Sequence, residues 1–156
     1  MAKSKPKARN RSVILNRRAR YDYILGEETT AGLALNGKQV RAARDGRVQL
    51  KGSYVTVRAG ELWLNNASWT LKVNEPNRNE NVVSTEPVKL LVTKKQLHQL
   101  EQARRDGNTI AALRLNTAGR LLKLVIATGK GKKKYDKRET IKRRESAREA
   151  ARSMKR

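Results

Sequence analysis

The chain has 156 residues and contains no cysteine. This absence excludes disulfides, thiolate catalysis, iron–sulfur clusters and zinc sites built on cysteine. The single histidine, His98, has no second imidazole with which to form a histidine-based metal site or proton relay. We therefore expect a protein that needs neither a metal nor an organic cofactor.

Long apolar runs and catalytic motifs are also missing. No apolar run approaches the ~18 residues that a membrane helix requires, and the charged start of the chain lacks the apolar stretch of a secretory signal. There is no phosphate-binding glycine loop, no HExxH and no Gly-x-Ser-x-Gly. The one adjacent acid pair, Glu27-Glu28, would point to opposite faces of a strand. These absences predict a cytoplasmic, non-enzymatic protein with no membrane partner.

Acidic residues are scarce, whereas basic residues are abundant. The chain has 37 Lys+Arg against 14 Asp+Glu, which gives a net charge of +23 and a pI near 11.1. Residues 1–20 carry eight cations and no acid, and residues 130–156 carry 13 cations and four acids. Few bulky apolar residues accompany these cations, so a nucleic acid is a better partner than a membrane surface.

The two basic ends hold too few large apolar groups to offset the entropy of ordering. We expect residues 1–11 to be a disordered arm. Residues 130–156 are expected to be a tail that is disordered in the free protein. Ala147, Ala151 and Met154 recur at helical spacing in this tail, so it is predicted to become helical when bound.

The middle of the chain, residues 12–129, has the pattern of a small β-rich domain. Short apolar segments alternate with turns, which predicts a mainly β fold: a small antiparallel barrel with two or three short helices. Residues 74–81 are expected to be a polar loop. The expected elements are a strand at 13–15, a β-rich segment at 21–35, a helix at 38–44, a hairpin at 53–64, a strand at 88–92, a helix between Thr93 and Gly107, and a hairpin at 109–127.

Several motifs along residues 12–145 resemble the SsrA-binding protein (small protein B) family. The two strongest are the blocks at Asn16–Gly37 and Gly129–Arg138. The matching segments are NRRARYDY at 16–23, AGLALNG at 31–37, QVR at 39–41 with Arg44 and Gly46, Ser53-Tyr54, Lys89-Leu90-Leu91, and KGKKKYDKR at 130–138.

The resemblance implies an OB-type barrel that binds the tRNA-like domain of transfer-messenger RNA. It also implies delivery of that RNA to stalled ribosomes for trans-translation, with the C-terminal tail in the empty mRNA channel next to the decoding centre. Elongation factor Tu would take part indirectly. We expect the chain to act as a monomer.

The candidate RNA-binding residues follow partly from this resemblance and partly from charge. Asn16, Arg17 and Arg18 match the family's N-terminal motif, where Arg can grip phosphate and Asn can read a base edge. Leu91 and Lys123 match family positions linked to RNA binding. Core packing is the stronger interpretation for Leu91, whereas Lys123 should face outward.

The remaining candidates are basic residues elsewhere. Lys38 and Arg41 begin the short helix, where an external anion would offset their unfavourable charge near its N-terminus. The segment Gly129–Lys134, with Lys130, Gly131, Lys132 and Lys133, is interpreted as a hinge whose lysines neutralise phosphates. The candidate ribosome-contacting residues of the tail are Lys134, Tyr135, Asp136, Lys137, Arg138, Lys142, Arg143 and Met154.

Two other functions stay open at this point. The first is a structural rRNA-binding protein that sits permanently in a ribosomal subunit. The second is a nuclease or RNA-modifying enzyme, for which the sequence offers no acid cluster or nucleophile motif.

Overall fold

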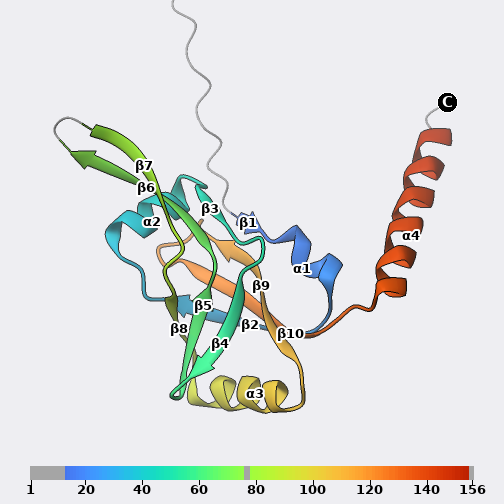
Figure 1. Ribbon diagram of the computed structural model, residues 1–156, viewed down its shortest axis with the longest axis horizontal. Coiled ribbons are helices and arrows are strands. Elements are labelled where there is room, and N and C mark those ends of the chain that lie inside the picture. Colours follow the sequence, from blue (N-terminus) through green and yellow to red (C-terminus); the bar gives the residue numbers. More distant parts are fainter. Residues whose placement is uncertain (1–12, 76–77, 155–156) are drawn as a thin grey trace, which may run out of the picture.

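The computed structural model describes residues 13–75 and 78–154 (Figure 1). The basic arm expected at residues 1–11 lies outside these residues. The strands are β1 (Val13–Leu15), β2 (Tyr23–Leu33), β3 (Val48–Gln49), β4 (Tyr54–Arg58), β5 (Glu61–Asn65), β6 (Ser68–Glu75), β7 (Arg78–Ser84), β8 (Val88–Leu91), β9 (Thr109–Asn116) and β10 (Lys123–Gly131). The helices are α1 (Arg17–Asp22), α2 (Gly37–Arg44), α3 (Lys94–Arg105) and α4 (Lys134–Ser153).

Six antiparallel strands form a closed ring. The sheet runs in the order β9-β10-β2-β8-β5-β4, and a further pairing of β4 with β9 closes it. Strand β1 pairs with the far half of β9 and lies outside the ring. Closure leaves the ring strands few unpaired edges, as expected for a small β protein. The predicted mainly-β fold is therefore confirmed.

Apolar side chains at every second position of the strands fill the interior of this ring. Leu124 and Ile126 of β10 are fully buried, as are Leu62 and Leu64 of β5. Trp69 of β6 is buried against the same cluster and joins the second sheet to the ring. The turn between β4 and β5 has positive φ at both Ala59 and Gly60, which suits the twist of a two-residue hairpin.

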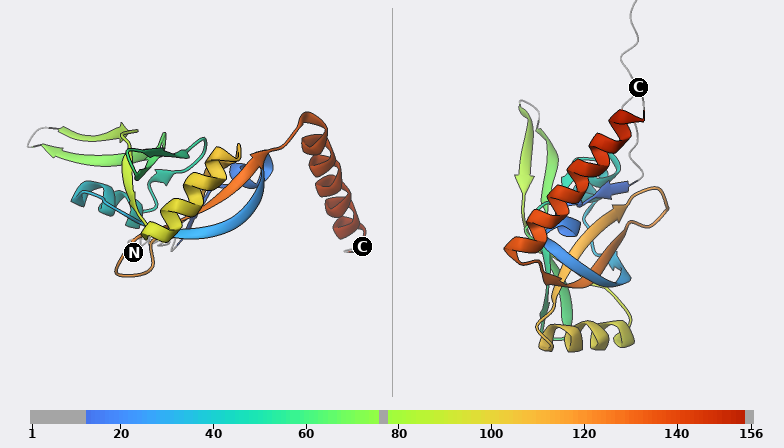
Figure 2. Two further views of the ribbon diagram at one scale, coloured as in Figure 1. Left: turned by 90° about the horizontal axis from the view of Figure 1, so that it is seen from below. Right: turned by 90° about the vertical axis from the view of Figure 1, so that its right-hand side faces the viewer.

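The prediction of a polar loop at residues 74–81 is wrong. β6 and β7 form a long hairpin whose pairs run from Trp69–Ser84 to Glu75–Arg78. With β3 they make a second, three-stranded sheet, and the hairpin projects well beyond the ring (Figures 1 and 2). Both of its strands are rich in polar residues near the tip, so the apolar alternation that signals a strand is missing there.

The short helices follow local capping signals. Asn36 and Gln39 form a reciprocal capping box at the start of α2, and Thr93 and Gln96 form another at the start of α3. Both helices were predicted. Helix α1 was not, because it is one and a half turns long and is set by its cap, Asn16.

The prediction of a hinge at Gly129–Lys134 is wrong for its first three residues. Strand β10 continues to Gly131, and Gly129, Lys130 and Gly131 pair with β2. A Cβ on Gly129 would lie 2.8 Å from the backbone oxygen of Ile24. Gly129 therefore allows close approach of two strands, and only Lys132 and Lys133 connect the ring to α4.

The tail helix α4 extends away from the ring on the side of α1 (Figures 1 and 2). Its first turn is capped by Asp136, whose Oδ2 accepts a hydrogen bond from the Lys133 amide at 3.1 Å. None of its described residues is buried. Its first turn contacts α1 through Lys137, which pairs with Asp22, so the disorder expected for the free tail is not seen there. Beyond that turn nothing tests the expected disorder, and it stays a prediction.

Candidate RNA interface

One row of paired residues, called the outer row below, crosses the outside of five strands and consists of Val13, Asn116, Lys123, Gly32 and Leu91. Lys123 of β10 pairs with Asn116 of β9 and with Gly32 of β2. Asn116 also pairs with Val13 of β1, and Gly32 also pairs with Leu91 of β8. Paired residues in a sheet point to the same face. The register thus places Lys123 and Leu91, which are 32 positions apart in the sequence, on either side of a glycine.

Leu91 is exposed, so the core position favoured for it is wrong. Its side chain is 52 % exposed, whereas Val88 and Leu90 of the same strand are buried. A Cβ on Gly32 would lie 3.4 Å from the Cβ of Leu91, so the glycine leaves the leucine uncovered. Lys123 is exposed as predicted. Leu91 and Lys123 together offer an apolar surface beside a cation.

The turn that leads into Lys123 is held by α2. The guanidinium of Arg44 donates to the backbone oxygens of Thr117, Gly119 and Arg120 at 3.5, 3.3 and 3.1 Å. The turn presents Leu121, which is 71 % exposed. Arg44 therefore fixes the segment that borders the outer row.

Asn16 does not read a base in this geometry. Its side chain is buried, with Nδ2 donating to the Ala112 oxygen at 2.8 Å and Oδ1 accepting from the Ala19 amide at 3.3 Å. These bonds begin α1 and place Ala19 against the outside of β9 and β10. Asn16 thus caps α1, the helix that carries the exposed side chains of Arg17 and Arg18.

We predict that Asn16→Ala lowers the free energy of unfolding by about 2 kcal/mol, because it removes a helix cap and a buried hydrogen bond to the Ala112 carbonyl. Urea unfolding measures this change. Asn81→Ala, at an exposed position of β7, is the control and should change stability by less than about 0.5 kcal/mol. If Asn16→Ala instead left stability unchanged but lowered RNA affinity, the side chain of Asn16 would have to contact a base, as the sequence predicted.

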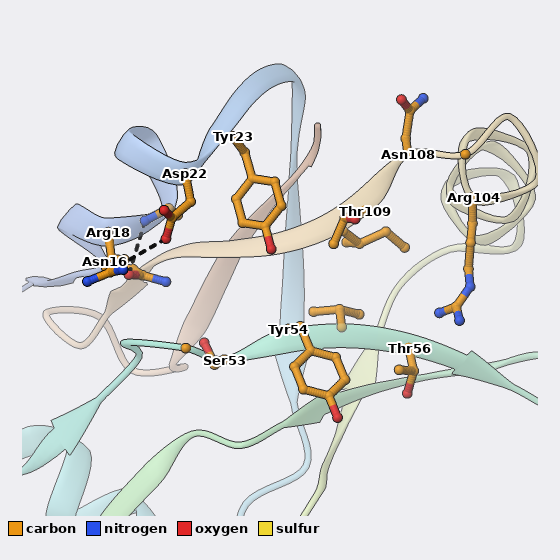
Figure 3. A pocket seen from close by; sticks show the side chains of 15 residues that line it. Asn16, Arg18, Asp22, Tyr23, Ser53, Tyr54, Thr56, Arg104, Asn108 and Thr109 are labelled. Carbon is orange, nitrogen blue, oxygen red and sulfur yellow. Dashed lines mark hydrogen bonds and ion pairs between the residues drawn. The ribbon is translucent and has the colours of Figure 1, made fainter. Parts of the chain in front are cut away.

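A groove of about 500 Å³ separates α1 from β4 and the end of α3 (Figure 3). Arg18 and Tyr23 line one side of it, and Tyr54 and Arg104 line the other. Tyr54 is 45 % exposed. Aromatic rings beside guanidinium groups suit an unpaired nucleotide.

The predicted RNA-binding residues form two groups. Lys38 and Arg41 are exposed on α2, the helix whose Arg44 holds the turn that leads into Lys123. Arg17, Arg18 and the lysines at 130–133 lie at the other end of β2 and β10. Strand β10 runs from one group to the other and spans about 26 Å. A ligand that contacts both must be an extended polyanion or a folded RNA.

The predicted tail residues lie along α4 and divide by environment. Most are exposed, Tyr135 by 63 % and Met154 by 87 %. Asp136 caps the helix, and Lys137 forms an ion pair with Asp22 of α1, with 3.1 Å between Nζ and Oδ1. The exposed members are Lys134, Tyr135, Arg138, Lys142, Arg143 and Met154.

Asp22 is the charged residue that sequence reasoning missed. Burial raises the pKa of its carboxyl, but the bonds to Lys137 and Arg18 outweigh that effect and hold the pKa below its usual value. The ion pairs are therefore complete above the ordinary aspartate pKa of about 3.9 and are lost only as the pH falls through the lowered value. A signal existed: Asp22 is the single acid among residues 1–26.

The described residues contain no cluster of three or more His, Cys, Asp or Glu that could hold a metal ion. Within the same residues, no helix is both long enough and apolar enough to span a membrane. The surface chemistry consists of cations, amides, tyrosines and exposed leucines, among them Leu91 and Leu121. A closed β ring with such an outer face and a cationic helical extension has the features of a nucleic-acid-binding protein.

Known proteins narrow this class to one family. The SmpB protein family matches residues 13–156. An SsrA-binding protein of Azorhizobium caulinodans is 43 % identical, with 99 % of this chain and 98 % of the relative covered. The SsrA-binding protein of Ligilactobacillus salivarius is 38 % identical over the same shares. The chain belongs to the SmpB family.

A solved structure is also similar. It is a chain of "tmRNA-SmpB: a journey to the center of the bacterial ribosome", with a TM-score of 0.61 and 32 % identity. The match covers 83 % of this chain and 94 % of the solved one. The antiparallel fold described above is thus one that a known SmpB chain shares.

Proposed function

We propose that the chain binds the tRNA-like domain of transfer-messenger RNA and delivers it to stalled ribosomes for trans-translation. The observation that carries this proposal is the outer row, where Lys123 and the uncovered Leu91 flank Gly32. A folded RNA loop offers both a phosphate for the lysine and an unstacked base for the leucine. Family membership and the similar solved chain support the choice of RNA.

The second part of the proposal concerns the tail. Exposed cations and no buried residue make α4 a poor element for the stability of the ring but a good ligand for an RNA-lined channel. We assign α4 to the empty mRNA channel, with Tyr135 and Arg138 near the decoding centre. The chain then acts as a monomer, and elongation factor Tu contributes indirectly.

A competition gel shift at about 0.2 M salt tests the proposal, because non-specific phosphate contacts are weak at that salt. The labelled RNA is the tRNA-like domain, and the competitors are an ordinary tRNA and an unrelated hairpin. We expect displacement by the unlabelled tRNA-like domain at far lower concentration than by either competitor. Equal displacement by all three would contradict the proposal and favour the structural rRNA-binding protein.

A further inference from the structure

A cluster of polar contacts joins α1 to the start of the tail helix. The carboxylate of Asp22 accepts from two elements: Arg18 Nε reaches Oδ2 at 3.0 Å, and Lys137 Nζ reaches Oδ1 at 3.1 Å (Figure 3 shows the first pair). The side chain of Asp22 is 22 % exposed, against 57 % for Arg18. A carboxylate in this position bridges the predicted RNA-contacting helix and the predicted ribosome-contacting tail.

The backbone reinforces the bridge. The Lys132 amide donates to the Asp22 carbonyl at 2.8 Å, and Lys132 Nζ donates to the Arg20 carbonyl at 3.2 Å. Lys137 Nζ also lies 5.9 Å from the centre of the Tyr21 ring, within the range of a cation–π contact. All of these contacts join residues 18–22 of α1 to each other or to residues 132–137 at the start of the tail.

An acid at this position is unfavourable for RNA binding by itself. Asp22 follows three exposed arginines of α1, Arg17, Arg18 and Arg20, and its negative charge repels phosphate. It also withdraws Arg18 from a ligand. Its contacts with Lys132 and Lys137 supply a structural reason for it, because α4 has no buried residue among those described that could fix its direction.

We propose that Asp22 is a positioning residue that pins the first turn of α4 to α1 and so sets the direction in which the tail leaves the ring. The rest of α4, beyond the pinned turn, is free to change its conformation. The importance of this direction for ribosome rescue rests on the proposed function. The pinning itself does not.

Spin-label distances test the pinning directly. The chain has no native cysteine, so labels attach only at the two introduced sites, Gln99→Cys on α3 and Tyr135→Cys in the first turn of α4, both exposed. In the free, full-length protein at pH 7 we expect one narrow distance distribution. Asp22→Asn should at least double its width, because the amide keeps the shape but loses the charge.

A matched control separates pinning from a general charge effect. Glu28→Gln removes another exposed carboxylate, which pairs with Arg114 at 3.0 Å and does not touch the tail, and it should leave the distribution narrow. Lys137→Gln should broaden the distribution as Asp22→Asn does, and the double variant should add little. A broad distribution in the unaltered chain, or a narrow one in Asp22→Asn, would overturn the proposal.

RNA binding and peptide tagging are measured in separate experiments. Asp22→Asn should bind the tRNA-like domain at least as tightly as the unaltered chain, yet support several-fold less peptide tagging on stalled ribosomes. If RNA binding proves non-selective while Asp22→Asn still broadens the distances, the proposed function fails and the pinning stands. If tagging is unchanged despite broadened distances, the direction of the tail is not used in rescue, and the functional half of the inference is wrong.

Discussion

Replacing Lys123 by alanine should weaken binding of the tRNA-like domain by about 10- to 100-fold. A hydrogen bond to a charged group contributes about 1.5–3 kcal/mol, and about 1.4 kcal/mol corresponds to a factor of ten. Lys123 is the one cation in the outer row, so no neighbour in that row replaces it. Lys123→Glu should lose still more affinity through repulsion of the phosphate.

The salt dependence of RNA affinity distinguishes the contribution of Lys123 from that of Leu91. Loss of one phosphate contact should reduce the slope of log K against log salt by somewhat less than one. Leu91→Ala should also lose affinity, about tenfold, but leave the slope unchanged because an apolar contact releases no counterion. Titrations at four salt concentrations measure both quantities.

The control for this pair is Lys95→Ala, an exposed lysine on α3. It changes the net charge as Lys123→Ala does but lies outside the outer row. An equal loss of affinity in Lys95→Ala would mean that the RNA responds to overall charge, and the outer row would lose its assigned role.

Removing residues 134–156 should abolish tagging on stalled ribosomes while the ring still selects the tRNA-like domain. The deletion removes α4, of which no described residue is buried, so the free energy of unfolding should change by less than about 1 kcal/mol. The truncated chain keeps all of β10 and the outer row. A reconstituted translation system with a message that lacks a stop codon measures the tagging.

A proline variant tests whether the tail acts as a helix or only as a charge. Ala147→Pro keeps the length and net charge of the tail but disfavours the helix by about 3 kcal/mol. We expect tagging to fall strongly, whereas Ala147→Ser should retain it. Full activity of Ala147→Pro would contradict a helical tail in the channel, and full activity of the truncated chain would contradict any role of the tail in rescue.

The sequence predicted most of the ring because its strands alternate and its helices carry caps. The same rule, applied more strictly, would have placed Leu91 correctly. Val88 and Leu90 differ by two positions and share the inner face, so Leu91 must point outward. The presence of two adjacent leucines obscured this, since apolar residue types alone do not say which member of a pair is buried.

Other features depend on contacts that no local pattern contains. The pairing of Lys123 with Gly32, and of Gly32 with Leu91, arises from the register of three strands far apart in the chain. The burial of Asn16 depends on a carbonyl 96 residues away. A polar hairpin such as β6–β7 is held by backbone pairing, which leaves little trace in residue type.

The central claim is that RNA recognition lies on the outer row of the ring. Site-directed crosslinking tests it most directly, since an introduced cysteine is the sole thiol in the chain. A benzophenone placed at Ala34, which is exposed and two residues beyond Gly32, should crosslink to the tRNA-like domain with high yield. The same group at Gln99 on α3 should give only background. Equal yields from the two sites, or a higher yield from Gln99, would contradict the assignment.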